Sequence, residues 1–257
     1  MSRSVKLSGV VVGTVDYGES DRVVTLLTVE RGKISAFARG ARVSRRRFGG
    51  ALEPFTLLAA EARERRGSDL LSLDSVAVVR AFGGIREDLA RIACASYACE
   101  LARELVREAE PHPALFDLLV DYLGRLEAAP ARPSALRAYE LGALGAVGLM
   151  PCLSSCARCG GPLAAGAVRF PFDPAEGGAV CAACASAAGP GTLRVEFATL
   201  EQLARLQAGG LDVAESEPLR PGAGTEAREA LSRFLEYHLG KRLKSRKFLD
   251  EVGALLG

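Results

Sequence analysis

RVVTLLTVERGKISAFARG, residues 22–40, holds two apolar runs rich in β-branched residues on either side of a short polar break. Runs of this composition favour β-strands, and Glu30-Arg31-Gly32 supplies a tight turn between them. Side chains alternate between the two faces of a strand, and in the second run one face carries Lys33, Ser35, Phe37 and Arg39. The stretch therefore predicts a β-hairpin with a basic face.

Similar runs on both sides of this hairpin predict three more strands, at residues 5–15, 52–62 and 70–79. Five short strands with no helical period among them fit a small closed barrel. The OB-fold is the five-stranded barrel that the pattern favours, and an SH3-like barrel is the competing shape.

After Phe82 the hydrophobic period changes to that of an α-helix. Helices are predicted at residues 85–110, 114–127 and 134–147, and again from 199 and from 225, the last running to 249. The Gly- and Pro-rich residues 207–224 are predicted to form a surface loop. The predicted fold class is α+β: an N-terminal OB-fold domain that binds nucleic acid at residues 1–81, then an all-α domain at residues 82–257, interrupted by a zinc-binding loop with four cysteines at about 152–190.

Two C-x-x-C pairs mark that loop, Cys156 with Cys159 and Cys181 with Cys184. Two such turns can close one tetrahedral Zn²⁺ site, whereas two chance pairings of buried cysteines within thirty residues are improbable. Four thiolates leave no coordination position open for a substrate, so the predicted zinc is structural.

The segment between the two pairs carries one Arg, no Lys and two acidic residues, which equips it poorly for contacts with phosphate. It is predicted to be a small hairpin clamped by zinc, with Phe170 and Phe172 offering apolar surface to the helices. The remaining cysteines are predicted to be small buried residues: Cys94, Cys99 and Cys152.

The composition is that of an ordinary globular protein, with 49% hydrophobic and 25% charged residues. No run approaches the roughly 18 to 20 apolar residues of a membrane span, and the N-terminal residues do not form a signal peptide. Seven cysteines, four of them in metal-type spacing, indicate a reducing compartment. We therefore expect a cytoplasmic protein that has no membrane partner.

The net charge of +2 is unevenly distributed, because residues 1–80 carry fourteen Lys and Arg against nine Asp and Glu. Residues 31–52 hold seven basic residues and no acidic one. Cations along a strand and loop can follow phosphates, and Phe48 within the run could stack on an unpaired base. A solvated charged loop is the alternative, and the pattern does not separate DNA from RNA. A second basic cluster at residues 241–247 is equally explained by the helix dipole.

Four segments together resemble the RecO family of bacterial recombination mediators: DYGESDRVVTLLT at 16–28, GKISAFARGAR at 32–42, RFGGALEPF at 47–55 and LGKRLKSRKFL at 239–249. The resemblance extends along essentially the whole chain. It implies an N-terminal OB-fold and a helical domain with a zinc-binding cysteine loop. It also implies binding of single- and double-stranded DNA, annealing of complementary strands and work with RecR. The resemblance further implies that the protein binds the single-strand-binding protein and helps to load RecA. It also implies association with the nucleoid.

The resemblance carries over two sets of residues. The DNA-contact candidates are Lys33, Arg39, Arg42, Arg45, Arg46 and Arg47. The zinc ligands are Cys156, Cys159, Cys181 and Cys184.

No enzymatic activity is predicted, because the sequence offers neither a nucleophile paired with a base nor a phosphate-binding P-loop. The acid–serine–acid set at residues 19–21 is predicted to be a barrel loop, with Gly18 permitting the turn. Two other function classes stay open from the residues alone: a zinc-clamped protein adaptor without DNA binding, and an RNA-binding factor with a cold-shock-like barrel.

Overall fold

The computed structural model describes residues 4–44, 47–64, 67–68, 70–163, 167–185 and 191–253. These residues form two compact units. The first comprises the chain up to Pro130 together with a C-terminal segment that begins at Lys244, and the second is Ala131–Leu243. Within the described residues, no helix is both long and apolar enough to cross a membrane.

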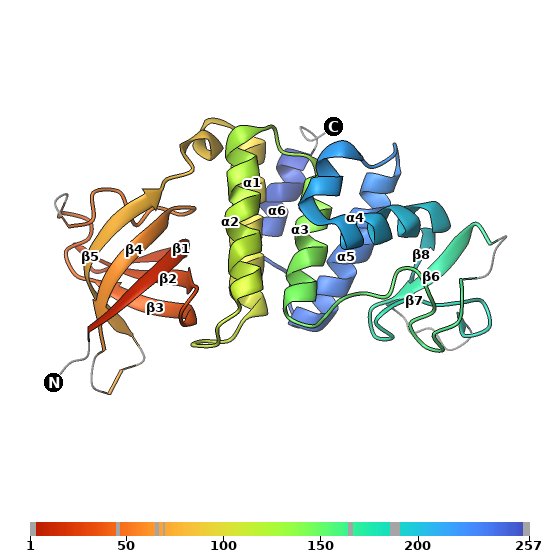
Figure 1. Ribbon diagram of the computed structural model, residues 1–257, viewed down its shortest axis with the longest axis horizontal. Helices are drawn as coiled ribbons and strands as arrows, with labels where there is room; N and C mark the ends of the chain where they lie inside the picture. Colours follow the sequence, from red (N-terminus) through yellow and green to blue (C-terminus); the bar gives the residue numbers. More distant parts are fainter. Residues whose placement is uncertain are drawn as a thin grey trace. The chain divides into compact units, whose positions relative to one another are not determined.

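A closed five-stranded barrel begins the first unit (Figure 1). Its strands are β1 (Ser4–Tyr17), β2 (Asp21–Thr28), β3 (Gly32–Ala38), β4 (Leu57–Arg63) and β5 (Leu71–Arg80). They pair in the order β1-β2-β3-β5-β4, and β1 closes the barrel by pairing with β4. Neighbours are antiparallel except β3 and β5, which pair in parallel. The predicted OB-fold barrel and the hairpin turn before Gly32 are confirmed.

Alternation along each strand fills the barrel with aliphatic side chains, as in β3, where Ile34, Ala36 and Ala38 are buried and the residues between them are half-buried. The predicted fourth strand is wrong in its start, because β4 begins at Leu57 rather than at residue 52. Phe55 has a φ of 69°, a left-handed conformation that interrupts extended backbone. Residues 39–44 and 47–56 therefore lie outside the strands, and Phe48, Leu52 and Phe55 among them are buried.

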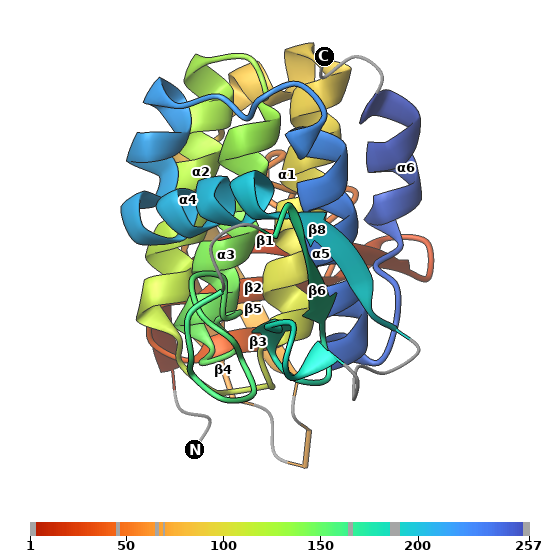
Figure 2. The ribbon, with the colours of Figure 1, turned by 90° about the vertical axis from the view of Figure 1, so that its right-hand side faces the viewer.

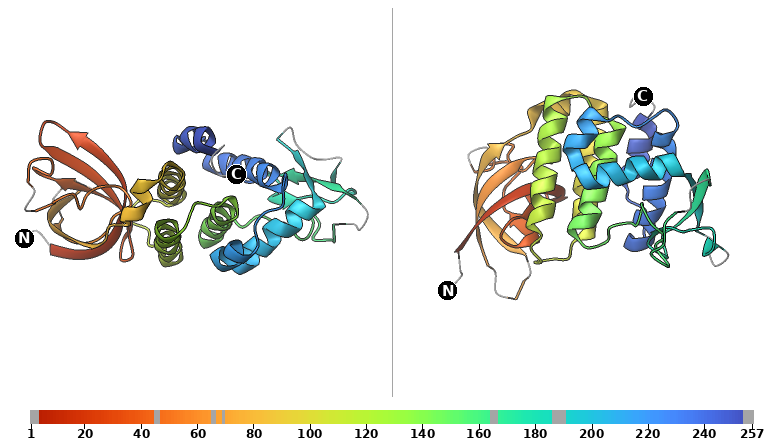
Figure 3. Two further views of the ribbon diagram at one scale, coloured as in Figure 1. Left: turned by 90° about the horizontal axis from the view of Figure 1, so that it is seen from above. Right: turned by 45° about the vertical axis from the view of Figure 1, so that its right-hand side comes forward.

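Helices of the first unit are the short 3₁₀ helix η1 (Gly83–Glu87), α1 (Leu89–Leu105), α2 (Pro113–Ala128) and α6 (Ser245–Val252). The single helix predicted at 85–110 is thus shorter: the Asp88 carboxylate accepts from the Arg91 amide, caps α1 and fixes its start. Helices α1 and α2 lie side by side next to the barrel (Figure 3, left, yellow and yellow-green).

The segment after α1 packs closely against the barrel at the start of β3. The Ala109 amide donates to the Lys33 carbonyl at 2.8 Å, and a Cβ on Gly32 would lie only 1.8 Å from the Glu110 carbonyl oxygen. The first compact unit accordingly includes α1 and α2 together with the barrel, whereas the boundary between the two domains was predicted at residues 81 and 82 and stays a prediction.

The long helix predicted from 225 to 249 is interrupted. Gly240 adopts a φ of 66° and ends α5 (Ala223–Leu239), so that α6 forms a separate helix in the first unit. The buried Glu100 carboxylate of α1 accepts hydrogen bonds from the amides of Lys244 at 3.0 Å and Ser245 at 2.7 Å. It therefore caps the start of α6 from another helix.

The second unit packs α3 (Pro133–Ala146) against α4 (Phe197–Ser216), with α5 beside them (Figure 2). Helix α4 continues into the region predicted as a surface loop, and it kinks at Gly210. A small sheet in the order β7-β6-β8 adjoins the helices: β6 (Arg169–Asp173), β7 (Gly178–Ala179) and β8 (Leu193–Glu196).

Phe170 and Phe172 lie on β6 and are fully buried. The ring of Phe170 stands 5.6 Å from that of Phe197 on α4, and the ring of Phe172 stands 5.9 Å from that of Phe234 on α5. The predicted role of these two side chains is confirmed, because they anchor the cysteine loop to the helices.

Candidate metal centre and nucleic-acid interface

The four cysteines of the two C-x-x-C pairs come together in the loop that contains β6 and β7. Their Sγ atoms all lie within 4.8 Å of one another. The Sγ atoms of Cys159 and Cys181 are 3.9 Å apart. Tetrahedral coordination with metal–sulfur bonds of about 2.3 Å separates the sulfurs by about 3.8 Å. The donor set and its spacing therefore fit one tetrahedral metal ion.

Each C-x-x-C pair lies on a turn, here called a knuckle, that is formed by backbone hydrogen bonds. In the first, the Gly160 amide donates to the Cys156 carbonyl and the Cys156 amide to the Gly161 carbonyl. Gly160 needs its left-handed φ of 72° for this turn. In the second, the Cys184 amide donates to the Cys181 carbonyl at 3.1 Å.

Two backbone hydrogen bonds fasten the approach to the first knuckle to the sheet. The Cys152 amide donates to the Gly177 carbonyl at 2.9 Å, and the Ala179 amide donates to the Cys152 carbonyl at 2.8 Å. A Cβ on Gly178 would lie 2.3 Å from that carbonyl oxygen, so only glycine fits at this contact.

The thiols of the cluster differ in acidity. Burial alone would raise the pKa of Cys156, but hydrogen bonds from the Cys181, Cys159 and Arg158 amides and from the Cys159 thiol outweigh it and lower the pKa to about 6. Hydrogen bonding with the Cys181 and Cys159 side chains, followed by burial and Cys156, raises the pKa of Cys184 to about 12. The Cys156 thiol therefore loses its proton more readily than the Cys184 thiol, and thiolates are the form that binds metal.

The remaining cysteines stand outside this group. Cys94 and Cys99 are buried in α1, and burial raises the pKa of Cys99 to about 12, so the prediction of small buried residues is confirmed for this pair. Cys152 is half-buried rather than buried, and its Sγ contacts the Ser155 hydroxyl at 3.2 Å.

The basic residues predicted to contact DNA do not behave alike. Lys33 has a structural role: its ammonium donates to the carbonyl oxygens of Arg103 at 3.0 Å and Val106 at 2.8 Å, at the C-terminal end of α1. Two of its three N–H groups thus point at the end of this helix, so we leave Lys33 out of the set of exposed basic residues defined below, and its contact with DNA stays a prediction.

Arg39, Arg42 and Arg47 are exposed on the loop that follows β3. The Arg47 guanidinium donates to the Arg39 carbonyl oxygen and stacks 4.9 Å from the centre of the Phe48 ring. Arg45 and Arg46 lie outside the described residues. We refer to Arg39, Arg42 and Arg47 as the basic loop. Phe48 itself is only 3% exposed, so its predicted role in stacking on a base is wrong.

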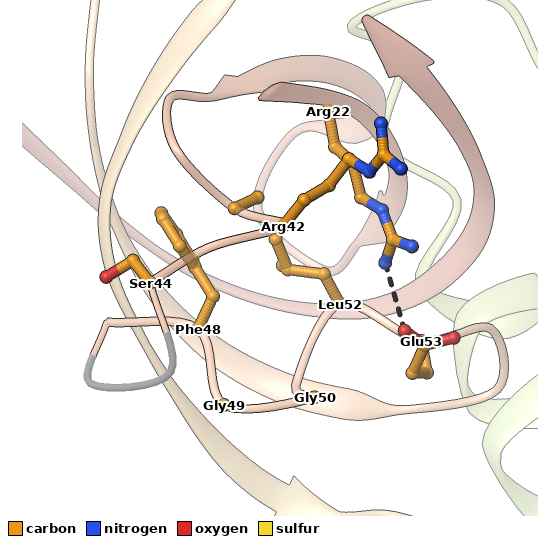
Figure 4. Close-up of a pocket in the computed structure, with 9 residues that line it drawn as sticks. Arg22, Arg42, Ser44, Phe48, Gly49, Gly50, Leu52 and Glu53 are labelled. Atoms are coloured by element: carbon orange, nitrogen blue, oxygen red, sulfur yellow. Dashed lines mark hydrogen bonds and ion pairs between the residues drawn. The ribbon is translucent and has the colours of Figure 1, made fainter. Parts of the chain in front are cut away.

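A pocket of about 240 Å³ opens beside the basic loop, between that loop and the start of β2 (Figure 4). Arg22 and Arg42 both line it. Arg22 pairs with Glu53 at 2.9 Å and Asp16 at 2.8 Å, and hydrogen bonds to these carboxylates raise the pKa of Arg22. Arg42 lies 3.6 Å from Asp16. Two carboxylates offset the charge of Arg22, whereas Arg42 has one longer contact and a side chain that is 41% exposed, so Arg42 is the arginine of this pocket that is better placed for phosphate.

Sequence spacing could not find the pair of Arg22 and Glu53, because thirty-one positions of sequence separate the two side chains. The acid-free stretch of residues 31–52 likewise acquires acidic neighbours in the fold, with Arg31 pairing with Glu64 at 2.8 Å.

The C-terminal basic cluster is also partly structural. Arg246 is 7% exposed and pairs with Asp250 at 2.9 Å, while the Lys244 amide binds Glu100. Lys247, with an 86% exposed side chain, points into solvent near Glu251.

Comparison with known proteins covers nearly the whole chain. Residues 1–82 match the family model described as Recombination protein O N terminal, and residues 86–247 match that described as Recombination protein O C terminal. A DNA repair protein RecO of Anaeromyxobacter dehalogenans strain 2CP-C is 70% identical over 253 residues, covering 98% of each chain. That of Myxococcus xanthus strain DK1622 is 50% identical over 243 residues, covering 95% of this chain and 96% of the relative.

Proposed function

The chain belongs to the RecO family of DNA repair proteins, and from that premise we propose that it is a non-enzymatic recombination mediator that binds DNA through the basic loop of its barrel. It would bind single- and double-stranded DNA, anneal complementary strands and, together with RecR, help to load RecA onto DNA covered by the single-strand-binding protein. Acting on chromosomal DNA would place it at the nucleoid, in the cytoplasm.

The observation that supports the proposal most directly is the exposure of Arg39, Arg42 and Arg47 on one loop of an OB-fold barrel. A guanidinium group can bind phosphate through two parallel hydrogen bonds, and it keeps its positive charge at physiological pH. Arg45 and Arg46 belong to the same basic stretch of sequence and are proposed to contribute to it.

Annealing requires no covalent chemistry. Two complementary strands repel each other through their phosphates, and cations that neutralise part of this charge let the strands approach until base pairs nucleate. The basic loop would supply such cations without reading sequence, because phosphate contacts are common to all sequences.

We propose zinc as the ion of the four-cysteine site, and Cys156, Cys159, Cys181 and Cys184 as its ligands. Four sulfur ligands in tetrahedral spacing are typical of structural zinc. Bound there, the ion would hold the two knuckles together and thereby keep β6 against α4 and α5.

An annealing assay with complementary oligonucleotides tests the proposal. We expect Arg39→Ala/Arg42→Ala/Arg47→Ala to slow annealing and weaken DNA binding. Lys6→Ala/Arg63→Ala/Arg107→Ala removes the same charge from other exposed residues of the first unit and should leave both close to wild type. Circular dichroism and thermal unfolding check that both variants are folded.

Wild-type protein that neither binds nor anneals DNA would contradict the proposal and leave a zinc-clamped adaptor as the better account. Tighter binding to RNA than to DNA of the same sequence would instead favour an RNA-binding factor.

A further inference from the structure

An apolar row crosses the outer face of the barrel on three adjacent strands, and it is exposed on β1 and half-buried on β2 and β3. Val15 on β1 pairs with Val23 on β2, and Val23 pairs with Phe37 on β3. Tyr17, two residues beyond Val15, turns to the same face and meets Phe37 edge to face, with ring centres 5.8 Å apart and ring planes at 81°. Val15 is 67% exposed and Tyr17 is 62% exposed.

Helix α1 covers the neighbouring part of this face but not the row itself. Gly13 and Thr25 form the adjacent pair, and a Cβ on Gly13 would lie 2.9 Å from a guanidinium nitrogen of Arg103 on α1. Further along the same strands, Val15 and Tyr17 of β1 are exposed and Val23 of β2 is half-buried. The outer face of β1–β3 thus has one end packed against a helix and one end open.

The open end adjoins the basic loop. Arg39 follows Phe37 by two residues, directly after the end of β3, and is exposed. The residue paired with Tyr17 is Asp21, and its carboxylate accepts from the Gly40 amide at 2.7 Å and from the Ser20 hydroxyl at 3.0 Å. The rings of Tyr17 and Phe37 therefore lie at the end of the face from which Arg39 extends. The Asp21 carboxylate, opposite Tyr17, is already hydrogen-bonded to the Gly40 amide.

We propose that Tyr17 and Phe37 form a stacking platform for unpaired bases of single-stranded DNA, with Arg39 binding an adjoining phosphate. This inference rests on the proposed DNA binding. It adds a physical reason why the protein would bind single-stranded DNA differently from duplex DNA. Stacking needs a base whose face is free, and every base has one, so the platform tolerates any sequence. In a duplex the base faces are covered, and only the phosphate contacts of the basic loop remain.

The charge around the row favours a nucleic acid over a protein as its occupant. The adjoining basic loop carries Arg39, Arg42 and Arg47, and bases arrive together with a phosphate for each nucleotide. An aromatic pair without neighbouring cations would bind apolar partners indiscriminately, whereas this arrangement selects planar groups attached to anions.

The chain contains no Trp, which makes a site-specific fluorescent reporter available. Tyr17→Trp keeps an aromatic ring at the platform and introduces a single indole. We expect oligothymidylate to quench its fluorescence, and an abasic oligonucleotide of the same length to quench it far less. Val78→Trp, at an exposed position of β5 outside the row, is the control and should respond weakly to both.

Affinity measurements provide the second test. Tyr17→Ala/Phe37→Ala should bind oligothymidylate about 5- to 150-fold more weakly, as expected for the loss of about 1–3 kcal/mol of base stacking. Its affinity for the abasic oligonucleotide and for duplex DNA should stay near wild type. Tyr17→Phe should restore binding of the single strand. Val78→Ala/Val79→Ala removes exposed apolar side chains from β5 and should bind all three like wild type.

The outcomes separate this inference from the proposed function. Wild-type protein that binds none of the DNAs overturns the proposed function, and the inference with it. Binding of DNA with equal affinity by wild type and Tyr17→Ala/Phe37→Ala overturns the platform alone. A wild type that self-associates, with the double variant monomeric and unchanged toward oligothymidylate, would assign the row to contact between two copies and likewise overturn the platform.

Discussion

The ammonium nitrogen of Lys33 on β3 lies 2.8 Å from the carbonyl oxygen of Val106, the residue that ends α1. A second bond, to the Arg103 carbonyl at 3.0 Å, places the same charge where the negative end of the helix dipole is strongest. A lysine that the sequence pattern assigns to DNA thus joins the barrel to its first long helix.

Lys33→Ala is expected to reduce the free energy of unfolding by about 1–3 kcal/mol, because two carbonyl groups lose a charged donor. Chemical denaturation measures the change. Lys6→Ala, which removes a lysine with an 88% exposed side chain from β1, should change it by less than about 0.5 kcal/mol. Unaltered stability of Lys33→Ala, combined with weaker DNA binding, would return Lys33 to the interface.

Gly32→Ala should be more destabilising than Gly18→Ala, although the two glycines have nearly the same φ, 62° and 60°. Both substitutions place a Cβ in left-handed backbone, at a cost of about 1–2 kcal/mol. Only at Gly32 would the Cβ also meet a carbonyl oxygen, that of Glu110, whereas nothing lies within 4 Å at Gly18. The difference between the two variants in chemical denaturation therefore measures the contact between β3 and residue 110. Equal losses would show that the contact opens at little cost.

Arg39→Ala and Arg42→Ala should each weaken DNA binding and lower the slope of log affinity against log salt concentration by about 1, if each residue neutralises one phosphate. The reduction should be similar for any DNA sequence of one length. Titrations at several salt concentrations measure the slope. Arg63→Ala, whose guanidinium pairs with Asp74 on the barrel surface, is the matched control. An unchanged slope in both loop variants would contradict the assignment of phosphate contacts to the basic loop.

Cys159→Ser should abolish tight zinc binding and lower the melting temperature. Cys159 is exposed, so its replacement removes a ligand and little packing. Metal analysis of the purified protein and thermal unfolding report the two effects, and a chelator should bring the wild type to the melting temperature of the variant. Cys152→Ser, outside the group of four sulfurs, should keep its metal. Retention of zinc by Cys159→Ser would contradict the ligand assignment.

Alternation of apolar side chains predicted the barrel because it reports burial directly: Ile34, Ala36 and Ala38 face inward as their spacing requires. Two C-x-x-C pairs predicted the metal cluster for a similar reason. Each pair is brought together by residues next to it in the sequence, and the two pairs then had to meet only once to complete the site. What depends on neighbours within a few residues was accessible from the sequence.

Features that depend on residues far away in the sequence could not be predicted. The leucine period runs through Gly240, yet the left-handed backbone of this glycine ends α5, and Glu100 from α1 caps α6 as a separate helix. Phe48 lies within a basic run but turns into the barrel core. Tyr17 and Phe37 carry no joint signal in the sequence, since twenty residues and a second strand separate the two rings that meet in the fold.

The capping of α6 by Glu100 has a consequence for the order of synthesis. The barrel leaves the ribosome first, but the helix that completes its unit is translated only after all of residues 131–243. The unit whose synthesis begins first is therefore the last to have all of its helices. Until Lys244 and Ser245 have emerged, Glu100, which is 9% exposed in the finished fold, lacks the amides that it holds there.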